Sequence, residues 1–180
     1  MHKALFLDRD GVINVDYGHV YEIKKFHFVD GIFDLCKSAQ QNGYKIFVVT
    51  NQAGIAKGYY TEEDFHILND YMISKFDNHG IEISKVYFCP FHIEAVIAKY
   101  KKDSYDRKPN PGMLLKAKQD FHIDMSKSKL IGDKETDIVA ADKAGIGMKI
   151  LYGVSEDSIS DLTVGDFDKK VIDLIFSDDV

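Results

Sequence analysis

Hydrophobic residues follow two alternating patterns along this chain. Short apolar runs are separated by longer segments in which apolar residues recur every three or four positions. The short runs predict buried β-strands, and the longer segments predict amphipathic α-helices. The expected strands cover residues 4–7, 45–50, 85–89, 129–133 and 149–152, and the expected helices cover residues 31–43, 61–80, 110–122 and 134–145.

Local signals mark where several of these helices begin and end. Thr61 precedes a run of acidic residues, which is typical of a helix N-terminus. Glycine accepts the left-handed backbone conformation that often terminates a helix, so glycines are the expected helix ends. They are Gly43, Gly80 and Gly145.

The alternation of strands and helices indicates an α/β fold, a three-layer sandwich whose mostly parallel central sheet carries helices on both faces. The length of 180 residues suits a single domain over residues 1–180. The apolar stretch at residues 171–176 fits either a short helix or an edge strand, and the pattern does not decide between them. Residues 90–112 contain all three prolines and are expected to form an ordered loop.

The composition argues against several classes of partner. The chain has 23 Lys and Arg against 29 Asp and Glu, a formal net charge of −6, so we expect neither nucleic-acid nor membrane-surface binding. Cys36 and Cys89 are the only cysteines, which argues against a disulfide scaffold. The first residues do not follow the signal-peptide pattern, and no apolar stretch approaches the roughly 20 residues of a membrane span. We therefore expect a cytoplasmic protein.

Polar residues gather where the expected strands end. In a parallel sheet the carboxyl ends of the strands share one edge, and ligands bind there. Four separate stretches should therefore deliver acids, a hydroxyl group and cations to one edge of the sheet. The residues are Asp8 and Asp10 after the first strand, Thr50 and Asn51 at the second, Arg107 and Lys108 after the third, and Gly132 and Asp133 at the fourth.

This set of groups suits phosphoryl transfer to an aspartate. Asp8, Asp10 and Asp133 offer the hard oxygen ligands that Mg²⁺ prefers, and crowded carboxylates need such a cation. Thr50 and Lys108 supply the donors and positive charge that a phosphoryl group requires. Asp8 would attack in line, and Asp10 would protonate the leaving alkoxide and then deprotonate water.

Each of these features also has an ordinary structural explanation. An Asp-x-Asp pair at a strand end is often a polar turn, Thr50-Asn51 alone is more often a turn, and Lys108 alone fits a solvated loop. Asp133 alone fits a helix N-cap. Their occurrence in order, each at a strand end or in the adjoining loop, favours the catalytic interpretation.

Four stretches resemble the sequence motifs of the haloacid dehalogenase (HAD) superfamily. They are FLDRDGVIN (motif one), VVTNQAGIAKG (motif two), DRKPNPGM (motif three) and LIGDKETD (motif four). Within the superfamily, the chain resembles the D-glycero-D-manno-heptose 1,7-bisphosphate 7-phosphatases, which are close to the histidinol-phosphate phosphatases. The resemblance covers about residues 3–152.

The resemblance implies a HAD-like Rossmannoid fold and Mg²⁺-dependent hydrolysis of the 7-phosphate through an aspartyl phosphate. Asp8 would be the nucleophile, and Asp10 the acid and base that also gives its backbone carbonyl to Mg²⁺. Asp133 would complete the protein ligands, and Asp137 would support them. Thr50, Asn51 and Lys108 would hold the transferring phosphoryl group.

The resemblance also implies a set of substrate-binding residues and a small sugar phosphate as the partner. Arg107 and Lys134 match positions that contact the sugar or its distal phosphate, as Arg suits bidentate phosphate contacts. A monomer is expected. The remaining substrate positions are Asp16, Tyr17, Gly18 and His19 in one loop, and Gln52 and Ala53 after the second strand.

One stretch departs from the family pattern. The family holds a structural zinc ion through C-x-H and C-x-C motifs after the third strand. Here Cys89 remains, but Phe91 stands at the histidine position, and Ser104 and Asp106 stand where thiolates would be. Since a structural zinc ion needs four good ligands, we do not expect one. Packing of Phe91, Tyr100 and Tyr105 is the expected replacement.

No large insertion interrupts the motifs, so a separate cap domain is not expected. The nearest alternative enzyme is a histidinol-phosphate phosphatase, although its cationic substrate calls for more acidic residues. A DNA 3′-phosphatase would need a basic track, which the chain lacks. A phospho-receiver domain or a non-catalytic sugar-phosphate-binding protein is the alternative from another class. Asp10, as a residue dedicated to hydrolysis, argues against the receiver domain, and the presence of all the required catalytic groups argues against the non-catalytic protein. The sequence does not set the anomer, and hence does not choose between the lipopolysaccharide and nucleotide-heptose pathways.

Overall fold

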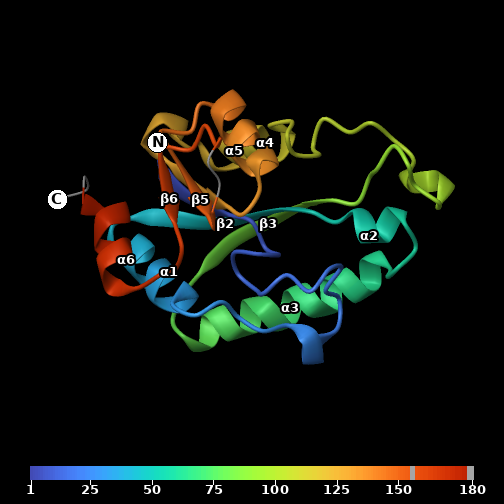
Figure 1. Ribbon diagram of the computed structural model, residues 1–180, viewed down its shortest axis with the longest axis horizontal. Helices are drawn as coiled ribbons and strands as arrows, with labels where there is room; N and C mark the ends of the chain where they lie inside the picture. The colour runs from blue at the N-terminus through green and yellow to red at the C-terminus, as the bar shows by residue number, and fades with distance from the viewer. Residues whose placement is uncertain (155–156, 178–180) are drawn as a thin grey trace.

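One six-stranded sheet forms the centre of the computed structural model, which describes residues 1–154 and 157–177 (Figure 1). Its strands lie in the order β3-β2-β1-β4-β5-β6, and all neighbouring pairs are parallel. The predicted parallel sheet is therefore confirmed. The strands are β1 Lys3–Leu7, β2 Tyr44–Asn51, β3 Ile83–Cys89, β4 Lys129–Gly132, β5 Met148–Tyr152 and β6 Leu162–Val164.

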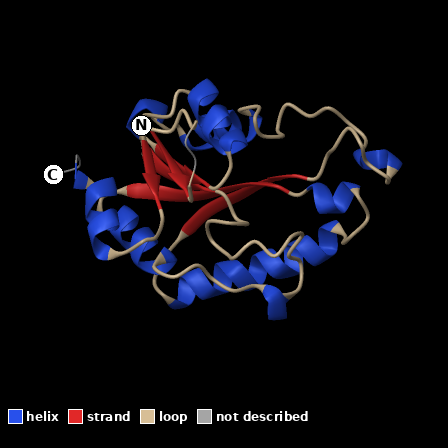
Figure 2. Ribbon diagram, in the orientation of Figure 1, coloured by secondary structure: helices blue, strands red, loops and turns tan. Residues whose placement is uncertain are grey.

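Helices cover both faces of this sheet and give the three predicted layers (Figure 2). One face carries α1 (Ile32–Gln41), α3 (Glu62–Asn78) and α6 (Lys169–Ile175), and the other carries α4 (Gly112–Phe121) and α5 (Glu135–Ala144). The short helix α2 (Ala53–Ala56) follows β2. Three 3₁₀ turns complete the described elements: η1 Ile23–Lys25, η2 Ala98–Tyr100 and η3 Met125–Lys127.

The alternation of side chains along β1 shows how the two cores form. Leu5 and Leu7 point to the core beneath α1 and α3, whereas Ala4 and Phe6 point to the core beneath α4 and α5. All four side chains are fully buried, because a strand covered on both faces buries every position. This explains why the first apolar run is continuous rather than alternating.

The strand order fixes where a ligand can bind. From β1 the chain proceeds through β2 and β3 to one edge, and through β4, β5 and β6 to the other. The crevice beside the carboxyl ends of β1 and β4 is therefore a topological switch point, the usual ligand site of such sheets. Asp8 directly follows β1, and Asp133 directly follows β4.

Most predicted elements agree with the structure to within about two residues. Thr61 is the N-cap of α3, and Gly145 ends α5 with a φ of 76°. The undecided stretch at residues 171–176 belongs to helix α6, which begins at the N-cap Asp168. Strand β6 was not expected from the pattern, because three residues at a sheet edge give too short a signal.

The loop at residues 90–108 is held partly as expected. Tyr100 is buried, donates a hydrogen bond of 2.6 Å to Glu62 on α3, and lies near Phe91 with ring centroids 6.2 Å apart. Tyr105 was expected to pack as well, but this prediction is wrong, since 62% of its surface is exposed. The hydrogen bond from Tyr100 to Glu62 connects this loop to α3.

The residues at or near the positions where the family pattern has zinc ligands make other contacts. Ser104 is buried and accepts a hydrogen bond from the Asp106 backbone, while the Asp106 carboxylate pairs with Lys116 on α4. His92 accepts a hydrogen bond of 3.0 Å from the Glu94 backbone.

No helix within the described ranges is long and apolar enough to cross a membrane.

Candidate active site

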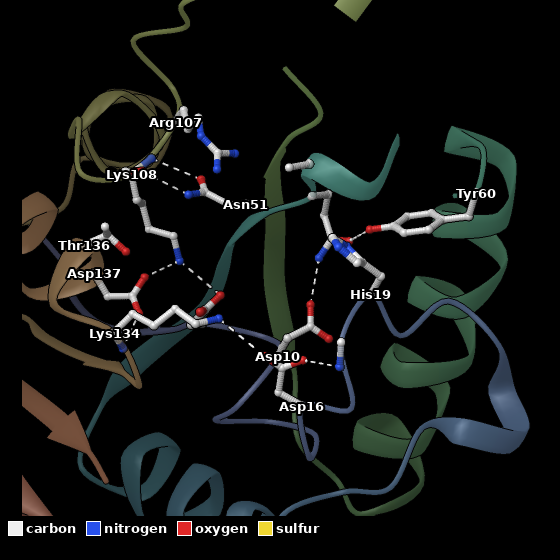
Figure 3. Close-up of a pocket in the computed structure, with 14 residues that line it drawn as sticks. Asp10, Asp16, His19, Asn51, Tyr60, Arg107, Lys108, Lys134, Thr136 and Asp137 are labelled. Carbon is white, nitrogen blue, oxygen red and sulfur yellow. Dashed lines mark hydrogen bonds and ion pairs between the residues drawn. The ribbon is translucent and has the colours of Figure 1, made fainter. Parts of the chain in front are cut away.

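A cavity of about 420 Å³ opens at the carboxyl edge of the sheet and collects most of the predicted site residues (Figure 3). They come from the ends of β1 and β2, the loop that follows β3, and the start of α5. The predicted residues that line it are Asp8, Asp10, Asp16, Gly18, His19, Asn51, Gln52, Ala53, Arg107, Lys108, Lys134 and Asp137.

Asp8 lies at the floor of this cavity and is almost fully buried. Its Oδ1 accepts a hydrogen bond of 2.8 Å from the Arg9 backbone and lies 3.0 Å from Lys108 Nζ. Both contacts fall on Oδ1, so Oδ2 is left free for attack. Burial raises the pKa of Asp8 to about 8; Lys108 opposes this rise, and the carboxylates of Asp137 and Asp133 add to it.

Lys108 is the cation that balances these acids. Its Nζ lies 2.6 Å from Asp137 Oδ1 and donates to the Val49 carbonyl at 2.8 Å. Burial opposes the charge, yet Asp137 and Asp8 hold the pKa of Lys108 above its usual range. Asn51 fixes the Lys108 backbone with one accepted and one donated hydrogen bond, of 3.1 and 3.0 Å. Lys108 is therefore a rigidly placed, permanently charged group.

Asp10 lies beside Asp8 and is held by donors from three directions. Arg9 Nη2 lies 3.0 and 2.9 Å from its two oxygens, Asn14 Nδ2 donates to Oδ1 at 3.0 Å, and Gln52 Nε2 donates to Oδ2 at 3.0 Å. The side chain is 17% exposed, so it reaches the cavity while remaining fixed. This placement suits a group that must transfer protons at one defined point.

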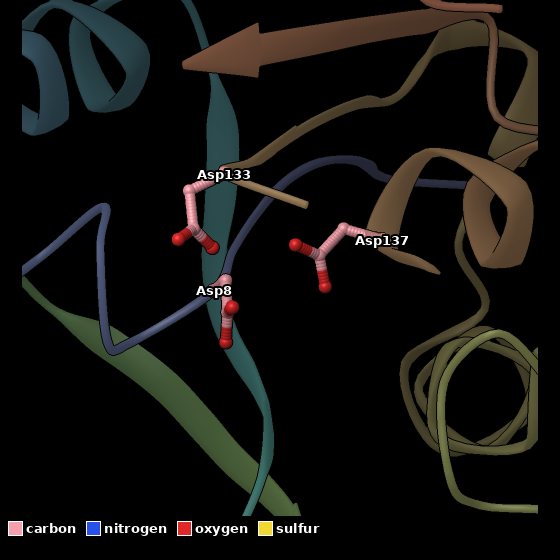
Figure 4. A group of neighbouring side chains, drawn as sticks. All are labelled: Asp8, Asp133 and Asp137. Carbon is pink, nitrogen blue, oxygen red and sulfur yellow. The ribbon is translucent and has the colours of Figure 1, made fainter. Parts of the chain in front are cut away.

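Three carboxylates come close enough to share a cation (Figure 4). Ligand oxygens of Asp8, Asp133 and Asp137 all lie within 4.8 Å of one another. Asp133 Oδ1 is buried and has no hydrogen-bond partner, and burial raises the pKa of this group. Both oxygens of Asp137 are already engaged, by Lys108 and by the Lys134 backbone. Asp8 and Asp133 therefore fit Mg²⁺, and Asp137 fits a supporting role.

Gly11 makes room for this arrangement. Its φ of 94° lies in the left-handed region, where glycine is favoured. A Cβ atom there would lie only 2.2 Å from Asp133 Oδ2. The glycine after the Asp-x-Asp pair is thus required both by the turn and by the approach of the fourth motif.

Two further cationic groups line the cavity. Arg107 lines the cavity, and its Nη1 is buried and makes no hydrogen bond with the described residues. Lys134 Nζ lies 3.3 Å from Asp16 and 3.8 Å from Asp133, with 57% of its side chain exposed. Both cations therefore line the same cavity as Asp8 and Lys108.

Three predicted residues are not among those that line the cavity: Asp133, which belongs to the carboxylate cluster described above, Tyr17 and Thr50. Tyr17 is 59% exposed and turns to His27, whose Nδ1 lies 3.2 Å from its hydroxyl oxygen, in a neighbouring surface cleft. Thr50 is buried at 1% exposure, and its hydroxyl accepts a hydrogen bond of 2.8 Å from Gln52. Thr50 thus lies directly beneath the wall that Gln52 forms.

The structure adds residues that the sequence reasoning did not single out. Tyr60 and Thr136 line the cavity, and Arg9 lies fully buried behind Asp10. Each falls inside or next to a quoted motif, but nothing in the pattern shows that these side chains turn inward. Their positions depend on how the loops fold back over the sheet.

Comparison with known proteins matches this geometry to one family. Residues 105–163 match the sequence model of the HAD-hydrolase-like family. The D-glycero-α-D-manno-heptose-1,7-bisphosphate 7-phosphatase of Burkholderia mallei is 55% identical over 150 residues, which cover 83% of this chain and 79% of that protein. The β-anomer 7-phosphatase of Vibrio cholerae is 47% identical over 148 residues, covering 82% and 80%.

The chain belongs to the heptose-1,7-bisphosphate 7-phosphatase family of HAD hydrolases. Members of this family are phosphoric monoester hydrolases, as the sequence motifs predicted. A putative HAD-like phosphatase structure from Mesorhizobium loti superimposes with a TM-score of 0.87 at 29% identity, covering 99% of this chain and 86% of that one. A D,D-heptose 1,7-bisphosphate phosphatase from B. bronchiseptica, complexed with magnesium and phosphate, shares the fold with a TM-score of 0.79 at 22% identity and coverage of 98% and 99%.

Proposed function

We propose that this protein is a Mg²⁺-dependent phosphatase that converts D-glycero-D-manno-heptose 1,7-bisphosphate into heptose 1-phosphate and inorganic phosphate. One observation carries the proposal: a single cavity holds a free Asp8 oxygen beside Lys108 and is also lined by two further cations, Arg107 and Lys134. A bisphosphate offers one phosphate to Asp8 and a second anion to these further cations. Relatives at 43–55% identity carry the same named activity.

Asp8 performs the first step as the nucleophile. Its Oδ2 attacks the phosphorus of the 7-phosphate, and the bond from phosphorus to the sugar oxygen breaks as the aspartyl phosphate forms. Lys108, 3.0 Å from Oδ1, stabilises the charge that builds on the phosphoryl oxygens. Thr50, through its hydroxyl, and Asn51 would hold the same phosphoryl group from the end of β2.

Asp10 completes both steps as acid and base. It gives a proton to the departing sugar oxygen and afterwards takes a proton from the water that attacks the aspartyl phosphate. That attack breaks the bond between phosphorus and Asp8, releases inorganic phosphate, and returns both carboxyl groups to their starting states. The fixed position of Asp10 beside Asp8 lets one residue serve both transfers.

Asp8 and Asp133, with the backbone carbonyl of Asp10, are the groups that would hold Mg²⁺. When bound, the ion would supply positive charge that offsets the charge of these carboxylates and of the substrate. Asp137 positions Lys108, which contacts Asp8, and the Lys134 ammonium lies 3.8 Å from Asp133. We expect no structural zinc, because Ser104, Asp106 and His92 are engaged by other groups.

Arg107 and Lys134 are the proposed contacts of the 1-phosphate. The Arg107 guanidinium and the partly exposed ammonium of Lys134 would donate hydrogen bonds to a second anion, and Lys134 would exchange its contact with Asp16 for that anion. The neighbouring loop would contact the sugar hydroxyls, and Tyr17 would have to turn away from His27 to join it. The loop residues are Asp16, Gly18 and His19, with Ala53 on the opposite wall.

We also propose that the α anomer is the preferred substrate. Two relatives named as α-anomer enzymes are 55% and 50% identical to this chain over the matched residues, whereas relatives named as β-anomer enzymes are 43–47% identical. A preference for α would connect the reaction to nucleotide-activated heptose rather than to the lipopolysaccharide core.

We infer a single-domain monomer that works on this small molecule in the cytoplasm, without nucleic-acid or membrane partners.

Phosphate release from defined substrates tests this function. The substrates are α- and β-heptose 1,7-bisphosphate and histidinol phosphate, each with Mg²⁺ and with EDTA. We expect Mg²⁺-dependent release that is fastest from the α bisphosphate. Faster release from the β bisphosphate would overturn the anomer only, whereas faster release from histidinol phosphate would overturn the substrate class while keeping the mechanism.

A further inference from the structure

Gln52 is fully enclosed by polar partners although it lines the cavity. Its Nε2 donates to Asp10 Oδ2 at 3.0 Å and to Thr50 Oγ1 at 2.8 Å. Its Oε1 accepts from the Tyr60 hydroxyl, and Arg9 Nη2 lies 3.4 Å away from the same oxygen. An amide has two N–H donors and two acceptor lone pairs, so these four contacts use its full capacity. The residue is only 1% exposed.

The chemistry of the neighbours fixes which way this amide faces. A guanidinium group cannot accept a hydrogen bond, so Arg9 must meet the amide oxygen. The Asp10 carboxylate cannot donate when ionised, so it must meet the amide nitrogen. A flipped amide would lose both contacts at once. The orientation in the structure is therefore the one that this network permits.

Tyr60 is held tightly in the place from which it donates. Its ring is 6% exposed and stacks on Tyr21 at 5.3 Å with an interplanar angle of 14°. Gly54 lies so close that a Cβ atom there would be 2.2 Å from the Tyr60 ring. Burial raises the pKa of Tyr60, so its hydroxyl stays protonated and remains a donor. Figure 3 shows the Tyr60 side chain directed toward the Asp10 side of the cavity.

We propose that Gln52 is a positioning residue for Asp10 and Thr50, locked in place by the Tyr60 hydroxyl, and not a contact of the sugar. This differs from the role that family resemblance implies for Gln52. The proposal rests on the proposed mechanism, because it gives Asp10 the acid and base role. Tyr60 is thereby connected to catalysis through the hydrogen bond that its hydroxyl donates to Gln52.

The arrangement has a direct chemical purpose. Arg9 and Asn14 contact Asp10 from within its own turn, and Gln52 is the contact that comes from a different strand. Gln52 thus connects Asp10, the acid and base on the turn after β1, to Thr50 on β2, whose hydroxyl is the proposed hydrogen-bond donor to the phosphoryl group. Because the Thr50 oxygen accepts from Gln52, its own hydroxyl proton is left for the phosphoryl group. One amide therefore orients two groups to which the mechanism gives different roles, Asp10 in proton transfer and Thr50 in holding the phosphoryl group.

The variant Tyr60→Phe tests the proposal, since it removes one hydroxyl and keeps the stacked ring. Tyr100→Phe is the matched control, because Tyr100 is a buried tyrosine of the same aromatic cluster and its hydroxyl bonds to Glu62 instead. With the heptose bisphosphate we expect Tyr60→Phe to lower kcat about tenfold and to leave KM unchanged within about twofold. The fall in kcat is smaller than the full contribution of a general acid and base, because Asp10 itself remains. Tyr100→Phe should keep both constants.

A substrate that needs no acid separates positioning from a loss of folded enzyme. With p-nitrophenyl phosphate, p-nitrophenolate leaves without a proton, whereas hydrolysis of the aspartyl phosphate still needs Asp10 as a base. In rapid mixing, Tyr60→Phe should keep the rate and amplitude of the first turnover while the following steady rate falls about tenfold. Gln52→Leu should show the same split.

Three outcomes would overturn the proposal: a raised KM with an unchanged kcat, an equal fall in burst amplitude and steady rate, or no change in either. The first would make Gln52 a sugar contact, and the second would make Tyr60 a stability residue. The readout with p-nitrophenyl phosphate also separates this proposal from the assigned substrate. If the wild-type enzyme fails with heptose bisphosphates but hydrolyses p-nitrophenyl phosphate, only the substrate assignment fails.

Discussion

Asp8 and Lys108 form a buried ion pair, with 9% and 2% of their side chains exposed. The acid is surrounded by other acids, and burial raises its pKa to about 8. Lys108 also pairs with Asp137, so a single cation is shared between two carboxylates. At the scale of single residues, the site of the free protein is therefore short of positive charge, and a divalent cation would supply it.

The variant Asp8→Asn should lower turnover of the bisphosphate by at least about 10⁴-fold, because the amide cannot form an acyl phosphate. The fold should remain, since the amide fills the same space and still accepts from Lys108. Phosphate release and a circular dichroism spectrum measure the two effects. Asp70→Asn on the exposed face of α3 is the control and should keep full activity. Substantial turnover by Asp8→Asn would reject the nucleophile assignment.

The variant Arg107→Ala should weaken use of the bisphosphate more than use of a monophosphate. Loss of a charged hydrogen bond to the 1-phosphate should raise KM for heptose 1,7-bisphosphate at least about tenfold, while KM for heptose 7-phosphate stays nearly constant. Lys101→Ala removes an exposed cation from the same loop and serves as the control. Equal losses on both substrates would show that Arg107 does not bind the distal phosphate.

At the scale of elements, helix α3 begins with a well-formed capping box. Thr61 Oγ1 accepts from the Asp64 backbone at 3.1 Å, and Asp64 Oδ2 accepts from the Thr61 backbone at 2.8 Å. These contacts satisfy helix N–H groups that have no partner within the helix. They also fix the chain immediately after Tyr60, which reaches into the active site from this position.

The variant Thr61→Ala should lower the free energy of unfolding by about 1 kcal/mol, the usual effect of losing a helix N-cap. Urea denaturation monitored by circular dichroism measures the change. Ser74→Ala, on the exposed side of the same helix, keeps the cap and should change stability less. If the two variants lose the same free energy, the capping box does not stabilise α3 in this protein.

At the scale of the whole molecule, the acidic site links stability to pH and to metal. The folded protein binds a proton on Asp8 more tightly than the unfolded chain does, whose carboxyl has the ordinary pKa of 3.8. A pKa raised in the folded state gives stability that is complete at low pH and is lost as pH rises. The loss therefore falls between about pH 4 and pH 8 and is complete above that range.

Metal-free Asp8→Asn should consequently melt at a higher temperature than the metal-free wild type, and the difference should grow from about pH 5 to pH 8. Mg²⁺ should stabilise the wild type more than the variant, because the variant lacks one anionic ligand. Differential scanning fluorimetry in EDTA and in Mg²⁺ measures both effects. A difference that is constant with pH would mean that Asp8 has an ordinary pKa in the folded protein.

The sequence by itself determined the sheet class and the chemistry at its edge. Short continuous apolar runs that alternate with amphipathic segments favour strands covered on both faces, and helices with a single apolar stripe supply that cover. The catalytic candidates follow directly at strand ends, so their positions along the chain already place them at one edge. Family resemblance added roles for these residues, and the relatives support the family.

Only the tertiary structure decided which groups meet across the site. The short strand β6 and the turn that brings Tyr60 inward give no clear pattern, because their residues are few and their contacts are distant in sequence. The same holds for Gln52, whose amide is oriented by residues from three different stretches. Hydrogen-bond capacity is a property of the folded neighbourhood, so a sequence motif can name Gln52 but cannot show that its polar atoms are already in use.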